Sequence, residues 1–276
     1  MIYIVGSKGI IFNSLKILFD DKSKVITRQN KKDHIKTNIF NNKFDAKNEK
    51  SLKLINKKDI VIILSNPGNI YFCEKNPEKL NKFLNNLTTN FLSNLNKKTR
   101  IIFFSSDYVF SGKKNIYFDN SKTSPINKYG AHKVYIENYI KKRFNNHLIL
   151  RLPKIFSNDL KINSIISESY LNRKKEQNLF YDHKCHFLNI IDFSKIFIKI
   201  FKKKLVGTFN IPSKIYLSRF EFISYFFKIN NIDNKFLKKK SINDFNMFNI
   251  PKKIKMKSKL STFKYLTKKQ NFEIKQ

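Results

Sequence analysis

The sequence of 276 residues is poor in several residue types, and each shortage excludes a class of protein. Its two cysteines, Cys73 and Cys185, cannot build the disulfide framework that staples a small secreted domain. A reducing, cytoplasmic setting is therefore expected. No uninterrupted apolar run approaches the roughly 18 residues of a membrane span, so no membrane partner is expected. No basic stretch precedes the first apolar run, and a secretory signal is not expected either.

Acidic residues are also scarce, with 20 Asp and Glu against 56 Lys and Arg and a formal net charge of +36. Such a charge suggests nucleic-acid binding, but only six of the basic residues are arginine, whose planar fork suits base and phosphate recognition. The lysines are spread along the whole chain rather than gathered in one stripe. We interpret the charge as a solvated, lysine-rich surface and expect no specific nucleic-acid partner, with non-specific binding to polyanions at low salt.

What the sequence does contain is a series of short apolar runs that alternate with segments of helical spacing. The runs lie at residues 2–6, 24–28, 59–65 and 100–106, and helical spacing covers 10–19 and 78–95. Near-continuous apolar strands separated by helices predict a parallel sheet covered on both faces. The expected fold class is therefore α/β, a doubly wound Rossmann-type sheet, which binds ligands at the carboxyl ends of its strands. A hydrophobic content of 41% is enough for one large domain, alone or with a small appendage.

Glycine is scarce, with six in all, yet two glycines stand in the loop between the first strand and the first helix. A loop of this kind lets the backbone approach a pyrophosphate, which then binds at the helix N-terminus. A plain tight turn would need a glycine too, but the strand-loop-helix context favours a dinucleotide site. Its expected residues are Gly6, Ser7, Lys8, Gly9 and Ile10.

The residue after the second strand bears on the choice of cofactor. Arg28 stands where an acidic residue would accept a hydrogen bond from the adenosine ribose. An arginine there can pair with a 2′-phosphate, which favours NADP over NAD as the cofactor. A solvent-facing arginine is the equally weighted alternative, and NAD remains an option.

Tyr129 and Lys133 lie four residues apart at the start of a segment of helical spacing that runs to Ile140. Residues four apart share one helix face. A nearby ammonium lowers the phenol pKa from about 10 and so brings tyrosine toward general-acid behaviour. The spacing alone is a weak signal, because a chain with 12 Tyr and 56 Lys and Arg contains such pairs by chance. An ordinary surface helix explains the pair as well.

A second motif strengthens the first. The strand at 100–106 ends in Ser-Ser-Asp-Tyr-Val-Phe, and Tyr129 follows 23 residues after Ser106. The two motifs together resemble the extended short-chain dehydrogenase/reductase family, and most closely its branch of dTDP-4-dehydrorhamnose reductases. Further segments are similar to the family over most of the chain, among them the Cys-Glu-x-x-Pro-Glu helix entry at Cys73 and the strand ending in Arg at 148–156.

The resemblance implies an architecture. Residues 1–155 would form the NAD(P)-binding Rossmann domain, and residues 156–276 the substrate-binding region, with a segment near 186–206 returning to the Rossmann sheet. It also implies site residues. Tyr129 would be the general acid, Lys133 would lower the Tyr129 pKa and hold the nicotinamide ribose, and Ser106 would hydrogen-bond the substrate carbonyl. Asp45 falls where the family often contacts adenine.

The implied activity is NADPH-dependent reduction of a 4-keto nucleotide sugar in deoxysugar or surface-polysaccharide biosynthesis. The expected partners are the nucleotide-sugar substrate and, as an open option, a second copy of the chain in a homodimer. Departures from the family pattern leave two alternatives open. The segment at 185–188 resembles epimerases and dehydratases, which keep NAD tightly bound, as much as reductases. Phe12 replaces the third loop glycine, which supports a non-catalytic NADP-binding regulator.

The stretch Asp-His-Lys-Cys-His at 182–186 holds residue types that bind metals. On a strand, His183 and Cys185 would point to one face and His186 to the other. A closed metal site is therefore not expected there.

Overall fold

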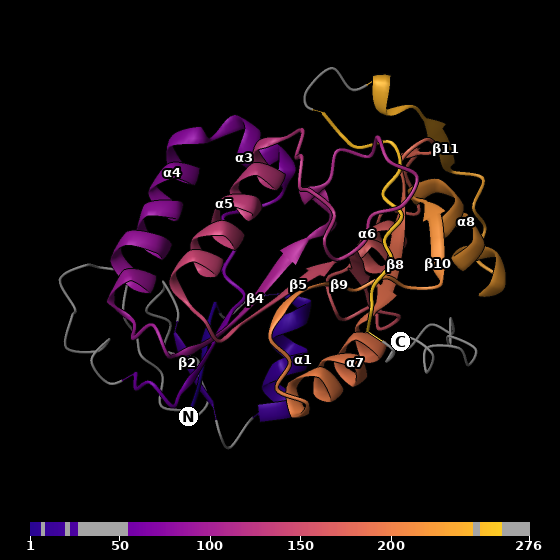
Figure 1. Ribbon diagram of the computed structural model, residues 1–276. Helices are drawn as coiled ribbons and strands as arrows, with labels where there is room; N and C mark the ends of the chain where they lie inside the picture. The colour runs from indigo at the N-terminus through magenta and orange to yellow at the C-terminus, as the bar shows by residue number, and fades with distance from the viewer. Residues whose placement is uncertain (7–8, 20–22, 27–54, 245–248, 261–276) are drawn as a thin grey trace.

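The computed structural model describes residues 1–6, 9–19, 23–26, 55–244 and 249–260. Within these residues the main feature is a six-stranded sheet in the order β2-β1-β3-β4-β5-β9, in which every neighbouring pair is parallel. The strands are β1 (Ile2–Val5), β2 (Ser23–Ile26), β3 (Ile60–Ile63), β4 (Arg100–Ser106), β5 (His147–Leu152) and β9 (Gly207–Asn210). The predicted α/β class with a parallel Rossmann-type sheet is confirmed (Figure 1).

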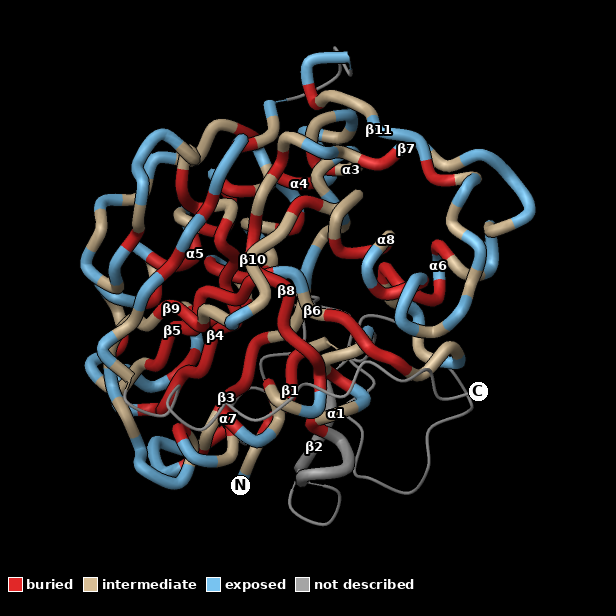
Figure 2. The backbone as a smooth tube through the Cα atoms, turned by 90° about the vertical axis from the view of Figure 1, so that its right-hand side faces the viewer, coloured by how far each residue is buried: buried red, intermediate tan, exposed pale blue. Residues whose placement is uncertain are grey.

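Helices cover both faces of this sheet because its strands are apolar on both sides. In β4, Phe103 packs with α4 and α5 while its neighbour Phe104 packs with α1 and α7. The helices are α1 (Ile10–Phe19) and α7 (Ile190–Lys202) on one face, and α4 (Pro77–Asn85) and α5 (Lys128–Arg143) on the other. In Figure 2 the buried backbone follows the central strands, and the outer turns are exposed.

The helix predicted at 78–95 is not one continuous α-helix. A short helix α3 (Ile70–Lys75) precedes α4, and after Asn85 the chain continues as a π-helical turn, Asn86–Phe91, and a 3₁₀ turn, Leu92–Asn94. Polar side chains here hydrogen-bond the carbonyls four residues earlier, as Thr88 Oγ1 does to Leu84 O at 2.8 Å. Such bonds compete with the regular helical pattern.

A smaller lobe stands beyond the end of β5. Its elements are β6 (Lys154–Phe156), α6 (Ile165–Leu171), β7 (Gln177–Phe180), β8 (Lys184–Asn189), β10 (Ile215–Ser218), α8 (Arg219–Ile229) and β11 (Leu237–Lys240). Strands β10, β8 and β6 form one small sheet, and β11 pairs with β7. The lobe has a core of its own, in which the rings of Phe187 and Phe222 stack with centroids 4.0 Å apart.

After β8 the chain leaves the smaller lobe and returns to the main sheet. Helix α7 follows β8 and places Phe193 and Phe197 in the same core as Phe104 of β4, and β9 then pairs with β5. The boundaries predicted at 155 and 156 stay a prediction. Within the described residues, no helix has both the length and the apolar character needed to cross a membrane.

Residues 249–260, here called the closing segment, run alongside β8 and link the two lobes (the yellow trace in Figure 1). The segment hydrogen-bonds β8 through Ile254 N, which donates to Lys184 O at 2.9 Å. It hydrogen-bonds the loop after β4 through Lys255 O, which accepts from Tyr117 N at 2.8 Å. Ile254 and Met256 are buried with Val109 and Phe110 in a small core of their own. The loop after β4 is therefore held from both sides.

Candidate active site

The turn after β1 begins at Gly6, the first residue of the pyrophosphate-binding loop predicted from the sequence. Gly6 has a φ of +106°, and a Cβ at this position would stand 2.8 Å from the backbone nitrogen of Ser65. Only glycine fits such a close approach at a positive φ. Gly9 and Ile10 lead into the first turn of α1, whose unpaired backbone N–H groups favour an anion. Ser7 and Lys8 of the predicted loop, together with Arg28 and Asp45, lie outside the described residues.

The departure at the third loop glycine has a structural explanation. Phe12 is 9% exposed and packs in the core between α1 and the sheet. A glycine at this position permits close packing of helix on strand. Here the aromatic ring takes up that space, so the substitution alters helix packing and leaves the turn at Gly6 intact.

Two consecutive serines end β4 and point to opposite sides of it. Ser105 Oγ donates to Glu137 Oε1 of α5 at 2.6 Å, behind the strand. Ser106 faces a cavity at the carboxyl edge of the sheet. Its Oγ donates to Asp107 Oδ1 at 3.0 Å and accepts from Tyr108 N at 3.2 Å. The predicted catalytic serine is therefore held in place by its two following residues.

The start of α5 brings Tyr129 to the same cavity. Asn127 caps the helix by accepting from Gly130 N at 2.8 Å, and Asn127 Nδ2 donates to Asn249 O of the closing segment at 3.0 Å. Gly130 is needed here, because a Cβ would stand 2.1 Å from the carbonyl oxygen of Tyr108. The glycine lets the helix approach the loop after β4. Tyr129 and Ser106 consequently line one cavity.

The electrostatics of Tyr129 and Lys133 differ from the expectation drawn from their spacing. Burial raises the pKa of Tyr129 to about 12, and hydrogen bonding with Ser106 and Asn66 acts in the opposite direction. Lys133 Nζ donates to Phe104 O at 3.2 Å and lies 5.8 Å from the centroid of the Tyr129 ring. Burial lowers the pKa of Lys133 to about 8. The expected lowering of the Tyr129 pKa by Lys133 is not found, because the ammonium is directed at a backbone carbonyl.

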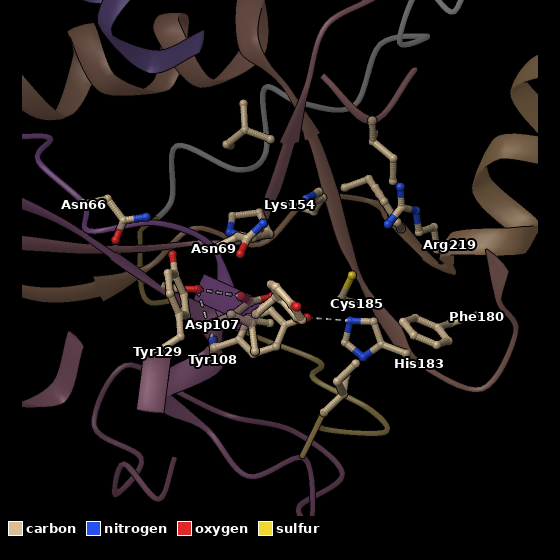
Figure 3. Close-up of a pocket in the computed structure, with 18 of the residues that line it drawn as sticks. Asn66, Asn69, Asp107, Tyr108, Tyr129, Lys154, Phe180, His183, Cys185 and Arg219 are labelled. Carbon is tan, nitrogen blue, oxygen red and sulfur yellow. Dashed lines mark hydrogen bonds between the residues drawn. The ribbon is translucent and has the colours of Figure 1, made fainter. Parts of the chain in front are cut away.

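The cavity has a volume of about 560 Å³ and lies between the sheet edge and the smaller lobe (Figure 3). Asn66 and Tyr129 lie toward one side of it and Arg219 toward the other, with Asp107 and Lys154 between them, and Ser106 also lines the cavity. Tyr108, Phe180, His183 and Cys185 also contribute to its wall. Strand alternation at 182–186 works as predicted, since His183 and Cys185 face the cavity while His186 Nε2 accepts from Met256 N of the closing segment at 3.0 Å.

Asp107 is the most perturbed carboxyl in this cavity. It is 3% exposed, and burial raises its pKa to about 7, against the effects of the Ser106 hydrogen bond and the Lys154 charge. Cys185 stands near it, and burial raises the pKa of that thiol so that it stays protonated. Asp107 can therefore exchange a proton near neutral pH, one hydrogen bond away from Ser106.

Sequence reasoning did not identify several residues of this cavity. Asn66 follows β3 in the stretch Asn-Pro-Gly-Asn. Asp107 stands inside the recognised motif beside Ser106. Lys154 and Arg219 come from β6 and α8 of the smaller lobe, and only the fold brings them to the sheet edge.

Comparisons with known proteins agree with this geometry. The profile of the family described as RmlD substrate binding domain matches residues 1–275. No curated protein sequence gives a significant match. A solved structure of a dTDP-4-dehydrorhamnose reductase from Clostridium acetobutylicum is similar with a TM-score of 0.72 and 19% identity, covering 92% of this chain and 89% of that one.

Two further solved structures extend the comparison to bound ligands. The dTDP-4-dehydrorhamnose reductase from Bacillus anthracis, in complex with NADP, is similar with a TM-score of 0.69 and 18% identity, over 92% of this chain and 89% of that one. MoeE5, in complex with UDP-glucuronic acid and NAD, is similar with a TM-score of 0.74 and 14% identity, over 94% of this chain and 90% of that one.

The parallel sheet with a cavity at its carboxyl edge fits an extended short-chain dehydrogenase/reductase, and the family match over residues 1–275 confirms this class, which the motifs predicted. Within that class, the chain belongs to the RmlD substrate binding domain family.

Proposed function

We propose that the protein reduces the 4-keto group of a nucleotide sugar with NADPH. The observation that carries this proposal is the meeting of Ser106 and Tyr129 in one cavity beside the Gly6 turn. The turn is compatible with a dinucleotide, because Gly6 lets the backbone turn tightly against Ser65 just before the N-terminus of α1. The bound NADPH would supply a hydride to the carbonyl carbon. A reducing, cytoplasmic setting is part of the proposal, since Cys73 and Cys185 are both unpaired and buried.

The chain's own residues have separable tasks in this reaction. Tyr129 donates its phenolic proton to the oxygen that becomes an alcohol, and its raised pKa keeps the proton in place until negative charge develops. Ser106 supplies a second hydrogen bond to that oxygen once its hydroxyl turns from Asp107 toward the substrate. Lys133 stabilises the phenolate once Tyr129 has lost its proton, by moving its ammonium from Phe104 O toward the Tyr129 ring, whose centroid lies 5.8 Å away. Asn66 lowers the pKa of Tyr129 in the same sense.

The far end of the cavity suits the diphosphate of a nucleotide sugar. Lys154 stands open to the cavity, and burial by the surrounding walls, followed by the charge of Arg219, lowers its pKa. Arg219 makes one ion pair, through Nη2 to Glu168 Oε2 at 3.2 Å. Two cations that disfavour each other gain from an anion placed between them. We assign the diphosphate to Lys154 and Arg219, and the sugar to the space between them and Tyr129.

The direct test is an assay of NADPH oxidation against a panel of 4-keto nucleotide sugars in which the nucleotide and the sugar are varied separately. We expect turnover with at least one member, at a rate that depends on added NADPH. NADPH should also bind more tightly than NADH if Arg28 contacts the 2′-phosphate, and Arg28→Ala should remove that preference.

Two outcomes would support the other functions that the sequence left open. Tightly bound NAD after purification, with turnover in the absence of added NADPH, would identify an epimerase or a dehydratase. Binding of NADPH without turnover of any panel member would identify a non-catalytic regulator.

A further inference from the structure

His183 connects the cavity to the closing segment through two hydrogen bonds. Its Nδ1 lies 2.5 Å from the carbonyl oxygen of Pro251, and its Nε2 lies 3.2 Å from the hydroxyl of Tyr108 (Figure 3). The histidine is 6% exposed, and its ring tilts against that of Tyr108 with centroids 5.9 Å apart. Tyr108 in turn meets the Tyr129 ring edge to face, with centroids 6.0 Å apart. The chain Pro251, His183, Tyr108 therefore ends beside the general acid.

The partner at Nδ1 determines the tautomer of His183. A carbonyl oxygen can only accept, so Nδ1 must carry the proton that is donated to Pro251. Burial lowers the pKa of His183, so the ring is neutral at neutral pH and carries only that one proton. Lys154 and Arg219 also lower this pKa, and Asp182 and the Pro251 hydrogen bond act against them. Nε2 is consequently an acceptor, and the Tyr108 hydroxyl must be the donor to it.

The polarity of Tyr108 follows from this chain. Burial raises the pKa of Tyr108 well above its usual range, so it keeps its proton. Because that proton is donated to His183, the phenolic oxygen presents only lone pairs to the cavity. We propose that His183, fixed by Pro251, makes Tyr108 an obligatory hydrogen-bond acceptor that selects sugars carrying a hydroxyl group next to the reacting carbonyl. His183 is thus a positioning residue, and Tyr108 is the residue that would touch the sugar.

The proposal rests on the proposed function for the identity of the ligand, but its physical basis can be tested without any substrate. Five histidines are present in the chain, so ¹⁵N NMR of the imidazoles can resolve His183, with His183→Phe supplying the assignment. We expect the Nδ1-protonated neutral tautomer near pH 7, and a shift of the Nε2 signal in Tyr108→Phe. A protonated Nε2, or an imidazolium at this pH, would overturn the proposal whatever the substrate is.

The second test measures discrimination rather than activity. dTDP-glucose and UDP-glucose are titrated into the protein with NADP present, and the one that binds is compared with its 2-deoxy and 3-deoxy analogues. The 3-position is next to the reacting C4, so the wild type should bind the 3-deoxy analogue about 3- to 10-fold more weakly, the usual value of one neutral hydrogen bond, while the 2-deoxy analogue serves as the control. Tyr108→Phe should abolish that ratio.

His183→Phe should reduce the same ratio, because the Tyr108 hydroxyl is then free to rotate. The matched control is His186→Phe on the same strand, since His186 is equally buried and also bonds the closing segment, but stands away from the cavity. This control should keep the wild-type ratio, even if the protein is less stable. An unchanged ratio in His183→Phe, or an equal loss in His186→Phe, would overturn the proposal. Absence of binding by either nucleotide sugar would count against the proposed function, while the NMR result would still decide the polarity of Tyr108.

Discussion

Two buried carboxyl groups stand on opposite sides of the end of β4, and each accepts a hydrogen bond from one of two neighbouring serines. Glu137 lies behind the strand, where Ser105 donates to it at 2.6 Å. Asp107 lies in front of it at the cavity, where Ser106 donates to it at 3.0 Å. Both are almost completely inaccessible to solvent. They differ in their other partners, because Glu137 forms ion pairs and Asp107 forms none among the described residues.

Glu137 is fully compensated. Arg151 Nε and Nη2 donate to its two oxygens at 3.0 and 2.8 Å, and Lys141 approaches at 3.3 Å. Burial alone would raise its pKa, but Arg151, Ser105 and Lys141 together lower it. Arg151 also donates to Asp119 O at 3.2 Å. The region behind β4 therefore ties α5, β4, β5 and the following loop into one fixed unit.

Asp107 is compensated much more weakly, by the Ser106 hydrogen bond and the charge of Lys154. Among the residues that the structure describes, no lysine or arginine forms an ion pair with it, and burial raises its pKa to about 7. A buried carboxyl at a cavity that has no ion-pair partner destabilises the folded state, but its raised pKa suits it to proton transfer. The end of β4 therefore separates two kinds of site: a stabilising ion pair at Glu137 behind the strand, and a titratable carboxyl at Asp107 that faces the cavity.

Removing the Glu137–Arg151 ion pair should have the largest effect on stability. Glu137→Gln leaves the Arg151 guanidinium buried without a counter-charge, which costs about 3–5 kcal/mol of the free energy of unfolding. Urea unfolding followed by circular dichroism measures it. Glu168→Gln is the matched control, because it breaks the other Glu–Arg pair, where Glu168 is 61% exposed, and should cost under about 1 kcal/mol. Similar losses in the two variants would contradict the contrast.

In front of the strand the predicted effect is a pH dependence. The folded pKa of Asp107 is raised above its unfolded value, so the unfolded chain releases this proton first. Stability is therefore lost as pH rises from about 4 to about 7. Asp107→Asn removes this loss, and its stability relative to the wild type should increase over that window by up to about 4 kcal/mol. Thermal unfolding of both proteins at several pH values provides the measurement. A difference that is constant with pH would show that Asp107 is not perturbed.

The two serines should separate the two tasks at a smaller scale. Ser105→Ala removes a hydrogen bond to a charged group and should cost about 1.5–3 kcal/mol of stability, with little change in turnover. Ser106→Ala should change stability less and slow NADPH-dependent turnover about 10-fold, since one neutral hydrogen bond to the substrate oxygen is lost. Unfolding curves and steady-state kinetics on both variants make the comparison. If the two variants lost stability and turnover to the same extent, the two sides of β4 would not differ in role.

The sequence predicted the parts of this arrangement that depend on local pattern. Apolar runs identified β1, β3 and β4, because a strand covered on both faces must be apolar throughout. The joint motif located Ser106 and Tyr129, which the structure brings to one cavity. Gly130 follows Tyr129 directly, and its close approach to the Tyr108 carbonyl explains why a glycine stands there.

Other features arise only from tertiary structure. Lys154 and Arg219 reach the cavity because β6 and α8 pack beside the main sheet, which no local spacing reveals. The direction of the pKa shift of Tyr129 could also not be predicted from the sequence, because desolvation depends on all the groups packed around the ring. A nearby lysine in the sequence suggested a lowered pKa, whereas burial makes the largest contribution in the structure and raises it.

The central claim is that Tyr129 protonates the substrate of an NADPH-dependent reduction, and Tyr129→Phe tests it most directly. The variant keeps the ring and its packing but loses the proton. With a 4-keto nucleotide sugar that the wild type reduces, single-turnover oxidation of bound NADPH should slow by about 10²–10⁴, the usual contribution of a general acid. The affinity for NADPH should not change. Reduction at the wild-type rate by Tyr129→Phe would contradict the account and reduce the Tyr129–Lys133 pair to the first turn of a helix.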